Sequence, residues 1–313
     1  MTLEFDLACP LCKTPLAITG GEAQCPQDGQ TYRRVDGIWQ LLRPDRAPLF
    51  AQFIHEYETI RTAEGRGSND PAYYRALPFA DLSGKMTADW AIRAQSFTTL
   101  LEQVIRPLEN RQPAAVRPLR ILDLGAGNSW LSYRLAKRGH HLAAVDLTVN
   151  HFDGLGAHTM YDADFLPIQA EFDHLPFTHS QVNLVIFNAS LHYSADYAAT
   201  LREAWRVAGP GGVVAVVDTP LYHDPASGAQ MVREREAQFQ ERYGFPSNAL
   251  PNENYLTYRR LDALAAELGL RRQLLWPVPR WRWAVRRLRT RLRGRREPAQ
   301  FPLIVLRRED GPQ

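Results

Sequence analysis

The stretch Ile-Leu-Asp-Leu-Gly-Ala-Gly-Asn-Ser, residues 121–129, decides the fold of this 313-residue chain. A short apolar run ends in two glycines, and the residues after it have a helical pattern that Gly139 closes. Glycines at such a turn let the backbone approach a ligand, and a helix N-terminus attracts polar or negative groups. The stretch therefore predicts a buried strand, a turn that can hold a ligand, and a helix. The alternative is a turn with a purely structural role, which has the same residues and binds no ligand.

Strands and helices alternate through the rest of the chain. Residues 196–207 and 261–268 have helical patterns. Further strands are predicted by apolar runs at residues 141–147, 182–190, 213–218, 270–278 and 301–308. This alternation is typical of a mostly parallel sheet with helices on both faces.

Two segments precede the alternating region. Residues 1–44 contain short β-like runs and glycine turns, which predict a small β-rich module. The pattern is helical from about residue 48 to residue 108, and a linker with two prolines follows at 110–118. We therefore expect an N-terminal module at 1–44, a helical connector or cap at 45–115, and an α/β domain at 116–313.

The composition is that of a globular protein, with 45% hydrophobic and 23% charged residues. No apolar run reaches the roughly 18 residues that a membrane-spanning helix needs. The first residues lack the basic and apolar regions of a secretory signal. We therefore expect a cytoplasmic protein with no transmembrane segment.

The net charge of +3 conceals a strong asymmetry. Between Arg271 and Arg296 there are eleven arginines and no lysine or acidic residue, so the rest of the chain carries −8. Such a block predicts a surface for an anionic partner, and arginine favours forked contacts to phosphate or carboxylate. One helical face within the block is apolar and consists of Trp281, Ala284, Val285, Leu288 and Leu292.

Three more motifs follow the glycine turn. Asp146 ends the next strand about 20 residues later, where a carboxylate can accept hydrogen bonds from both hydroxyls of a ribose. Glu171 stands four positions before Leu-Pro-Phe, and Gly-Pro-Gly-Gly at 209–212 precedes a strand. The third glycine of a dinucleotide-binding loop is absent, because Trp130 occupies its position.

Together these motifs resemble the class I S-adenosylmethionine-dependent methyltransferase family, in particular its type 11 group, over residues 116–308. The resemblance implies a Rossmann-like fold with a seven-stranded sheet, mostly parallel with an antiparallel last strand. Insertions at 219–255 and 279–298 would lie near the substrate. It also implies S-adenosylmethionine as cofactor, bound by Asp123, Gly125, Gly127, Asp146, Glu171, Phe172 and Asn188.

Carried over by position, the glycine turn would face the amino-acid part of the cofactor and Asp146 its ribose. Glu171 and the backbone of Phe172 would meet the adenine, and Asn188 would lie beside the methyl-donor end. Methyl transfer needs a general base only when the acceptor carries a proton that must leave. The candidates to act on or orient the acceptor are Asn188, His192, Tyr193 and Asp218.

The only three cysteines form a cluster, Cys-Pro-Leu-Cys at 9–12 and Cys25, with Asp28 in the place of a fourth cysteine. The two-residue spacing suits tetrahedral zinc, and a carboxylate oxygen can also bind it. Cys9, Cys12, Cys25 and Asp28 are therefore candidate zinc ligands; a metal-free module held by its small core is the alternative. The segment resembles the zinc-ribbon-like N-terminus of some bacterial methyltransferases, including those acting on guanine in large-subunit ribosomal RNA.

Three functions remain open. The first, which we expect, is methyl transfer to an anionic small-molecule or lipid-linked acceptor, with peripheral contact to the inner membrane surface through Arg271–Arg296. The second is RNA methylation, which the N-terminal resemblance and the arginines favour. The third is a non-catalytic binding module built on a cofactor fold.

Overall fold

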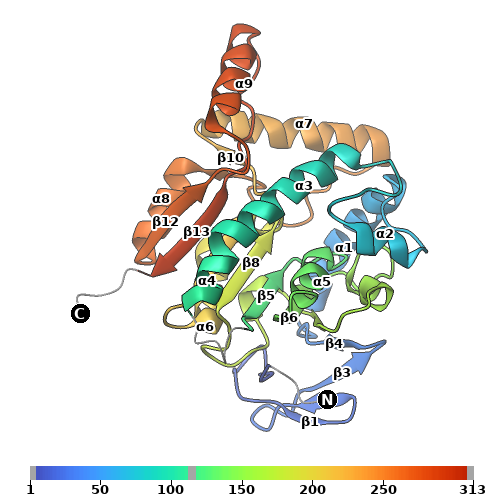
Figure 1. Cartoon of the computed structure of the whole chain (residues 1–313). Coiled ribbons are helices and arrows are strands. Elements are labelled where there is room, and N and C mark those ends of the chain that lie inside the picture. Colours follow the sequence, from blue (N-terminus) through green and yellow to red (C-terminus); the bar gives the residue numbers. More distant parts are fainter. Residues whose placement is uncertain (1–4, 112–117, 309–313) are drawn as a thin grey trace.

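The centre of the computed structural model, which describes residues 5–111 and 118–308, is one continuous sheet (Figure 1). Its strands lie in the order β1-β2-β3-β4-β7-β6-β5-β8-β9-β13-β12. The seven strands from β7 to β12 form the predicted arrangement, mostly parallel with β13 antiparallel to both neighbours. These strands are β5 (Arg120–Leu124), β6 (His141–Asp146), β7 (Leu166–Gln169), β8 (Leu184–Asn188), β9 (Val213–Val217), β12 (Leu270–Leu275) and β13 (Leu303–Arg308).

The middle strands are buried on both faces. Every residue of β8 and β9 is buried, which is why each was recognisable as a continuous apolar run. One face packs against α6 (Tyr197–Ala208) and α8 (Tyr258–Glu267). The other face packs against the helices α2 (Pro71–Ala76), α3 (Thr87–Leu100), α4 (Arg106–Arg111) and α5 (Trp130–Ala136), with a π-helical turn at Leu101–Ile105 joining α3 to α4. The α/β class predicted from the sequence is therefore confirmed.

The N-terminal strands extend the same sheet. They are β1 (Ala17–Thr19), β2 (Glu22–Gln24), β3 (Thr31–Val35) and β4 (Ile38–Gln40), which pair antiparallel in sequence. β4 then pairs in parallel with β7, with Trp39 opposite Ile168. Trp39 is almost fully buried, and the amide of Leu41 donates to the carbonyl of Gln169. The β-rich segment is thus joined to the main sheet through backbone hydrogen bonds across the expected boundary at residue 44.

A long helix follows this segment. It is α1 (Ala47–Ala63), which ends before the short α2. The expected boundary at residues 115–116 and most of the predicted linker lie at 112–117, outside the described residues. No helix in the described part of the chain has the length and apolarity that crossing a bilayer requires.

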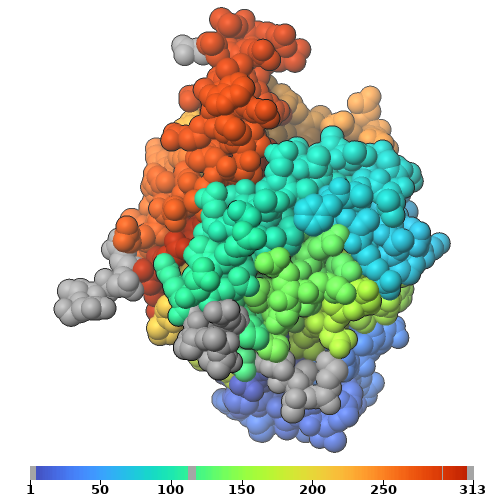
Figure 2. Space-filling view, in the orientation of Figure 1, coloured from blue at the N-terminus to red at the C-terminus, as the bar shows by residue number. Residues whose placement is uncertain are grey.

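Two insertions follow the last parallel strand. The first carries α7 (Pro225–Tyr243), whose N-terminus is capped by the side chain of Asp224 and whose C-terminus is Gly244 with φ of 84°. Two short parallel strands, β10 (Leu221–Tyr222) and β11 (Leu256–Thr257), close this insertion at its base. The second carries α9 (Arg280–Leu292), which projects away from the body of the molecule (Figures 1 and 2).

Candidate functional site

The glycine turn after β5 is held by the carboxylate of Asp146. Gly125 and Gly127 have φ of 72° and 53°, which side chains rarely adopt. A Cβ at Gly125 would also lie 2.3 Å from Cβ of Ser190. One Asp146 oxygen accepts from the Gly127 amide at 2.8 Å, and the other accepts from the amide and hydroxyl of Thr148, both at 2.8 Å. The carboxyl ends of β5 and β6 are thereby tied into one rigid edge.

A cavity of about 400 Å³ opens beside this edge. It brings together four residues predicted from the sequence, namely Gly125, Asp146, Glu171 and Phe172. Its apolar side comes from α1 and from the loop before β11, through Leu49, Phe50, Phe53, Leu250 and Pro251. Parallel sheets bind ligands beyond the carboxyl ends of their strands, which is where this cavity lies.

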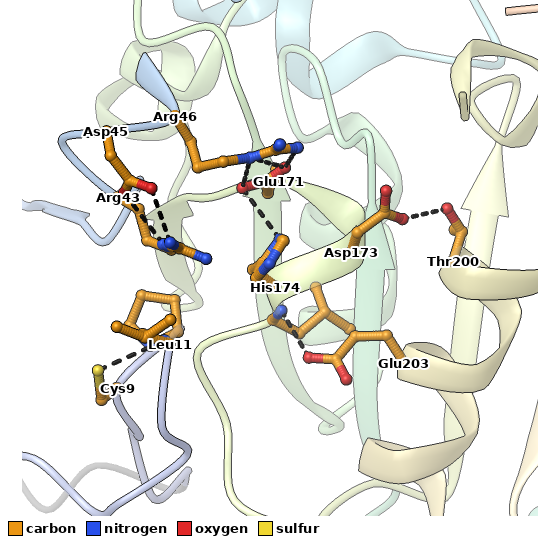
Figure 3. Close-up of polar contacts among 12 residues, drawn as sticks. Cys9, Leu11, Arg43, Asp45, Arg46, Glu171, Asp173, His174, Thr200 and Glu203 are labelled. Atoms are coloured by element: carbon orange, nitrogen blue, oxygen red, sulfur yellow. Dashed lines mark hydrogen bonds and ion pairs between the residues drawn. The ribbon is translucent and has the colours of Figure 1, made fainter. Parts of the chain in front are cut away.

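Glu171, which lines this cavity, contacts Arg46 and His174 (Figure 3). Nη2 of Arg46 donates to the Glu171 carboxylate at 2.6 Å, and Nδ1 of His174 lies 3.1 Å from it. Burial alone would raise the pKa of Glu171, but the contacts with His174 and Arg46 outweigh it, so the pKa is lowered. Arg46 precedes Glu171 by 125 residues, and no local pattern in the sequence indicated this pair.

A second cavity, of about 280 Å³, continues from the first past Gly125, Ala189 and Tyr193. The four residues predicted to act on the acceptor all line it, namely Asn188, His192, Tyr193 and Asp218. Gly127 lines it as well. The structure thus brings the ends of β8 and β9 and the glycine turn around one space.

His192 is neutral at physiological pH. It is 8% exposed, and its Nδ1 has no hydrogen-bond partner in the described part of the chain. Burial, with smaller contributions from Arg235 and Arg93, lowers its pKa to about 3. A histidine with so low a pKa accepts a proton weakly at neutral pH.

One carboxylate oxygen of Asp218 is buried without a hydrogen-bond partner among the described residues. Its other oxygen accepts from the hydroxyl of Ser96 at 2.6 Å. Burial raises its pKa, opposed by Arg93 and by Ser96. Of the residues predicted here, Asp218 is therefore better suited than His192 to take a proton. Tyr193 packs its ring on Phe53 and Tyr57.

Asp123 lines neither cavity. Its side chain is fully buried on the face of β5 that α5 covers, where it accepts from the hydroxyl of Ser132 at 2.8 Å. Burial raises its pKa to about 7. Any influence of Asp123 on a ligand would therefore pass through the glycine turn and α5, so the predicted direct contact has no support in this geometry.

Two arginines in the second cavity were not predicted. Arg61, from α1, is bonded to Asp153. Arg93, from α3, faces Asp218 and lies over the ring of Trp90, but within the described residues it forms no hydrogen bond or ion pair. The sequence predicts α1 and α3 as helices but does not indicate that Arg61 and Arg93 line a cavity. In an amphipathic helix, a single arginine is usually a solvent-exposed charge.

The cysteine cluster is assembled at the far end of the sheet. The ligand atoms of Cys9, Cys12, Cys25 and Asp28 all lie within 4.8 Å of one another. Sγ of Cys9 is 3.1 Å from an Asp28 oxygen, and the sulfurs of Cys12 and Cys25 are 3.4 Å apart. Three thiolates and one carboxylate oxygen at these separations fit a closed tetrahedral zinc site.

We predict that the purified protein contains one zinc ion per chain. Asp28→Asn should weaken zinc retention during dialysis against a chelator, because it removes an anionic ligand. Asp36→Asn, in the same segment but outside the cluster, is the control. Metal analysis by mass spectrometry measures the ratio; chains with no zinc when expressed in zinc-supplemented medium would contradict the prediction.

Comparisons with known proteins agree with this geometry. A family model described as a methyltransferase domain matches residues 122–216. A malonyl-[acyl-carrier protein] O-methyltransferase of Erwinia billingiae is 30% identical over 96 residues, 30% of this chain and 37% of that protein. A tRNA 5-carboxymethoxyuridine methyltransferase of Escherichia coli is 30% identical over 105 residues, 32% of this chain and 40% of that protein.

The chain thus spans about two fifths of the length of these curated relatives. Among solved structures, the CurJ carbon methyltransferase covers 93% of this chain and 77% of its own, with a TM-score of 0.50 and 17% identity. At that identity the likeness concerns the fold alone. The matched region contains the glycine turn, Asp146 and the strand that ends at Asn188. Residues 122–216 of this chain therefore match a methyltransferase domain, and the fold around them is that of such a domain.

Proposed function

We propose that this protein transfers the methyl group of S-adenosylmethionine to an anionic small-molecule or lipid-linked acceptor. The observation that carries the proposal is the pair of joined cavities. One is lined by Asp146, Glu171 and Phe172, and the other by Asn188, His192 and Asp218. Cofactor and acceptor can therefore meet at the carboxyl ends of β5 and β8.

The residues of the first cavity fit the nucleoside part of the cofactor. Asp146 has the oxygens to accept from the ribose hydroxyls, and the Phe172 ring and Glu171 lie where an adenine would bind. Arg93, which is unpaired within the described residues, lies on the far side of the glycine turn, in the second cavity. A guanidinium there can bind the carboxylate of the cofactor's amino-acid part.

Bound S-adenosylmethionine supplies an electrophilic methyl group on a sulfonium with a good leaving group. Asn188 and Tyr193 would orient the acceptor along the line of displacement, which is the main source of rate for such a reaction. An acceptor that is already an anion needs no base, which agrees with a neutral His192. For an acceptor that must lose a proton, the free Asp218 oxygen is the available base.

Support for an anionic acceptor comes from the two relatives, whose names describe acceptors that contain a carboxyl group, malonyl and carboxymethoxyuridine. The second support is α9. Trp281, Leu288 and Leu292 are 63%, 58% and 78% exposed, so the apolar face of this helix has no covering among the described residues. Figure 2 shows the helix standing clear of the body.

An exposed apolar stripe flanked by arginines is typical of a helix that lies in an anionic membrane surface. We propose this role for α9. The protein would then be cytoplasmic, would bind the inner membrane surface peripherally through α9, and would methylate an acceptor presented there. RNA methylation is the second candidate, because the same arginines could bind phosphates and the tryptophans could stack on bases.

The test is incorporation of label from methyl-labelled S-adenosylmethionine in an extract of the host. Label should enter the lipid or small-acid fraction and be absent with Asp146→Ala. Label in RNA alone would favour the second candidate. Calorimetry first establishes that the wild type binds S-adenosylhomocysteine and that the variant does not. Equal incorporation of label by the two proteins would then contradict the proposal.

A further inference from the structure

Arg235, on α7, is a half-buried cation that the steps above do not use. Its Nε is buried without a hydrogen-bond partner in the described part of the chain, and its guanidinium lies 5.9 Å from the ring of Phe239. Within the described residues it forms no ion pair. A buried donor without an acceptor is unfavourable and rare in folded proteins, so such a group points to a missing ligand.

Arg235 lines a third cavity, of about 190 Å³, between α1, α7 and the loop that follows α7. The walls are about as polar as they are apolar, and the apolar part includes Phe53, Tyr57, Ile60, Phe239 and Leu250. The polar groups opposite are Asn252 and Asn254, and Oδ1 of Asn252 is also buried without a partner among the described residues. The cavity therefore presents an apolar wall, the guanidinium of Arg235 and the side-chain amide of Asn252 to a ligand.

The other charges that line this cavity are already paired. Glu64 accepts from Arg66 at 2.6 Å, and Arg61 is bonded to Asp153. Arg235 is therefore the cation available here to a ligand, among the residues that the structure describes. A planar guanidinium binds a carboxylate or a phosphate through two parallel hydrogen bonds.

The third cavity adjoins the site of methyl transfer. Tyr57, Arg61 and Tyr193 line both this cavity and the 280 Å³ cavity that contains Asn188 and His192. Arg235 is also close enough to His192 for its charge to act on the imidazole. A ligand held by Arg235 can therefore extend past Tyr193 toward the end of β8.

We propose that this third cavity binds the acceptor, and that Arg235 recognises a carboxylate or phosphate on a small apolar or aromatic body. The proposal rests on the proposed function and names the part of the site that selects the substrate. Pockets for drug-sized ligands usually have about 300–1,000 Å³, so the bound portion of the acceptor is small. Because α7 belongs to the 219–255 insertion, that insertion would supply specificity.

The experiment uses the full chain saturated with S-adenosylhomocysteine. Benzoate, phenyl phosphate and benzamide are titrated in turn, and binding is followed by calorimetry. Benzoate or phenyl phosphate should bind about tenfold more tightly than benzamide, the usual gain from one hydrogen-bonded charge pair. Which anion binds distinguishes a carboxylate from a phosphate acceptor. Arg235→Gln should remove the preference for the anion.

Arg233→Gln is the matched control, because Arg233 is exposed on the same helix. It should keep the wild-type preference, and all three proteins should have the same melting temperature and the same affinity for S-adenosylhomocysteine. Equal binding of anionic and neutral probes to the wild type, or a preference that survives Arg235→Gln, overturns this assignment alone. A wild-type protein that does not bind S-adenosylhomocysteine overturns the proposed function itself.

Discussion

Asp146→Asn should weaken the binding of S-adenosylhomocysteine about a hundredfold or more. The carboxylate already accepts from the Gly127 amide and from Thr148, and it would also accept from the ribose hydroxyls. Hydrogen bonds to a charged group contribute about 1.5–3 kcal/mol each, and about 1.4 kcal/mol is tenfold in affinity. An amide at this position loses the charge and turns an NH2 group toward at least one donor.

Asp164→Asn provides the comparison, because Asp164 is exposed and lies outside the cavities. It should bind S-adenosylhomocysteine as the wild type does. Isothermal calorimetry gives the affinities, and thermal unfolding shows whether each variant is folded. A folded Asp146→Asn protein with wild-type affinity would remove Asp146 from the cofactor site.

Three arginines on α9 and one in the turn that follows it should account for most of the affinity for an anionic membrane. Arg282, Arg286 and Arg289 lie within one narrow stripe of the helix at 100° per residue, and Arg293 follows the last turn of that stripe. The stripe of Trp281, Leu288 and Leu292 lies beside it. Near an anionic surface each basic residue contributes about 1 kcal/mol. Replacing all four with glutamine should therefore weaken binding to phosphatidylglycerol-containing vesicles by roughly a thousandfold.

Vesicle sedimentation at several salt concentrations measures this effect. A control protein with four exposed arginines changed elsewhere, namely Arg33, Arg233, Arg242 and Arg259, has the same net charge and should bind nearly as the wild type does. Equal loss in both proteins would mean that total charge, and not α9, decides the affinity. Wild-type protein that binds RNA but not vesicles would favour the RNA candidate.

The parts of the fold that the sequence predicted well are those whose pattern is local. Strands β8 and β9 are buried on both faces, so each is an almost continuous apolar run of about the right length, and β5 has such a run interrupted by Asp123. The glycine turn and Asp146 are adjacent to such runs, and their positions followed from them. The helix at Arg280–Leu292 was visible because its apolar residues recur with helical spacing.

The remainder depends on contacts between distant parts of the chain. Nothing near Arg46 indicates Glu171, and nothing near Arg93 or Arg235 indicates a cavity. Asp123 is a different case. Successive side chains in a strand point to opposite faces, so Asp123 lies on the face opposite Leu122 and Leu124, beneath α5. The alternation of side chains along β5 is therefore sufficient to place Asp123 on this face.

The pairing of β4 with β7 makes the first 44 residues part of the enzyme's framework. If they were removed, β7 would become an outer strand with unpaired amides and carbonyls, open to pairing with another copy. Shortened versions that begin at α1 would then be expected to self-associate through that strand. The cysteine cluster links the turns of the same segment. Its loss would therefore be expected to lower the solubility of the protein before it affects the binding of S-adenosylhomocysteine.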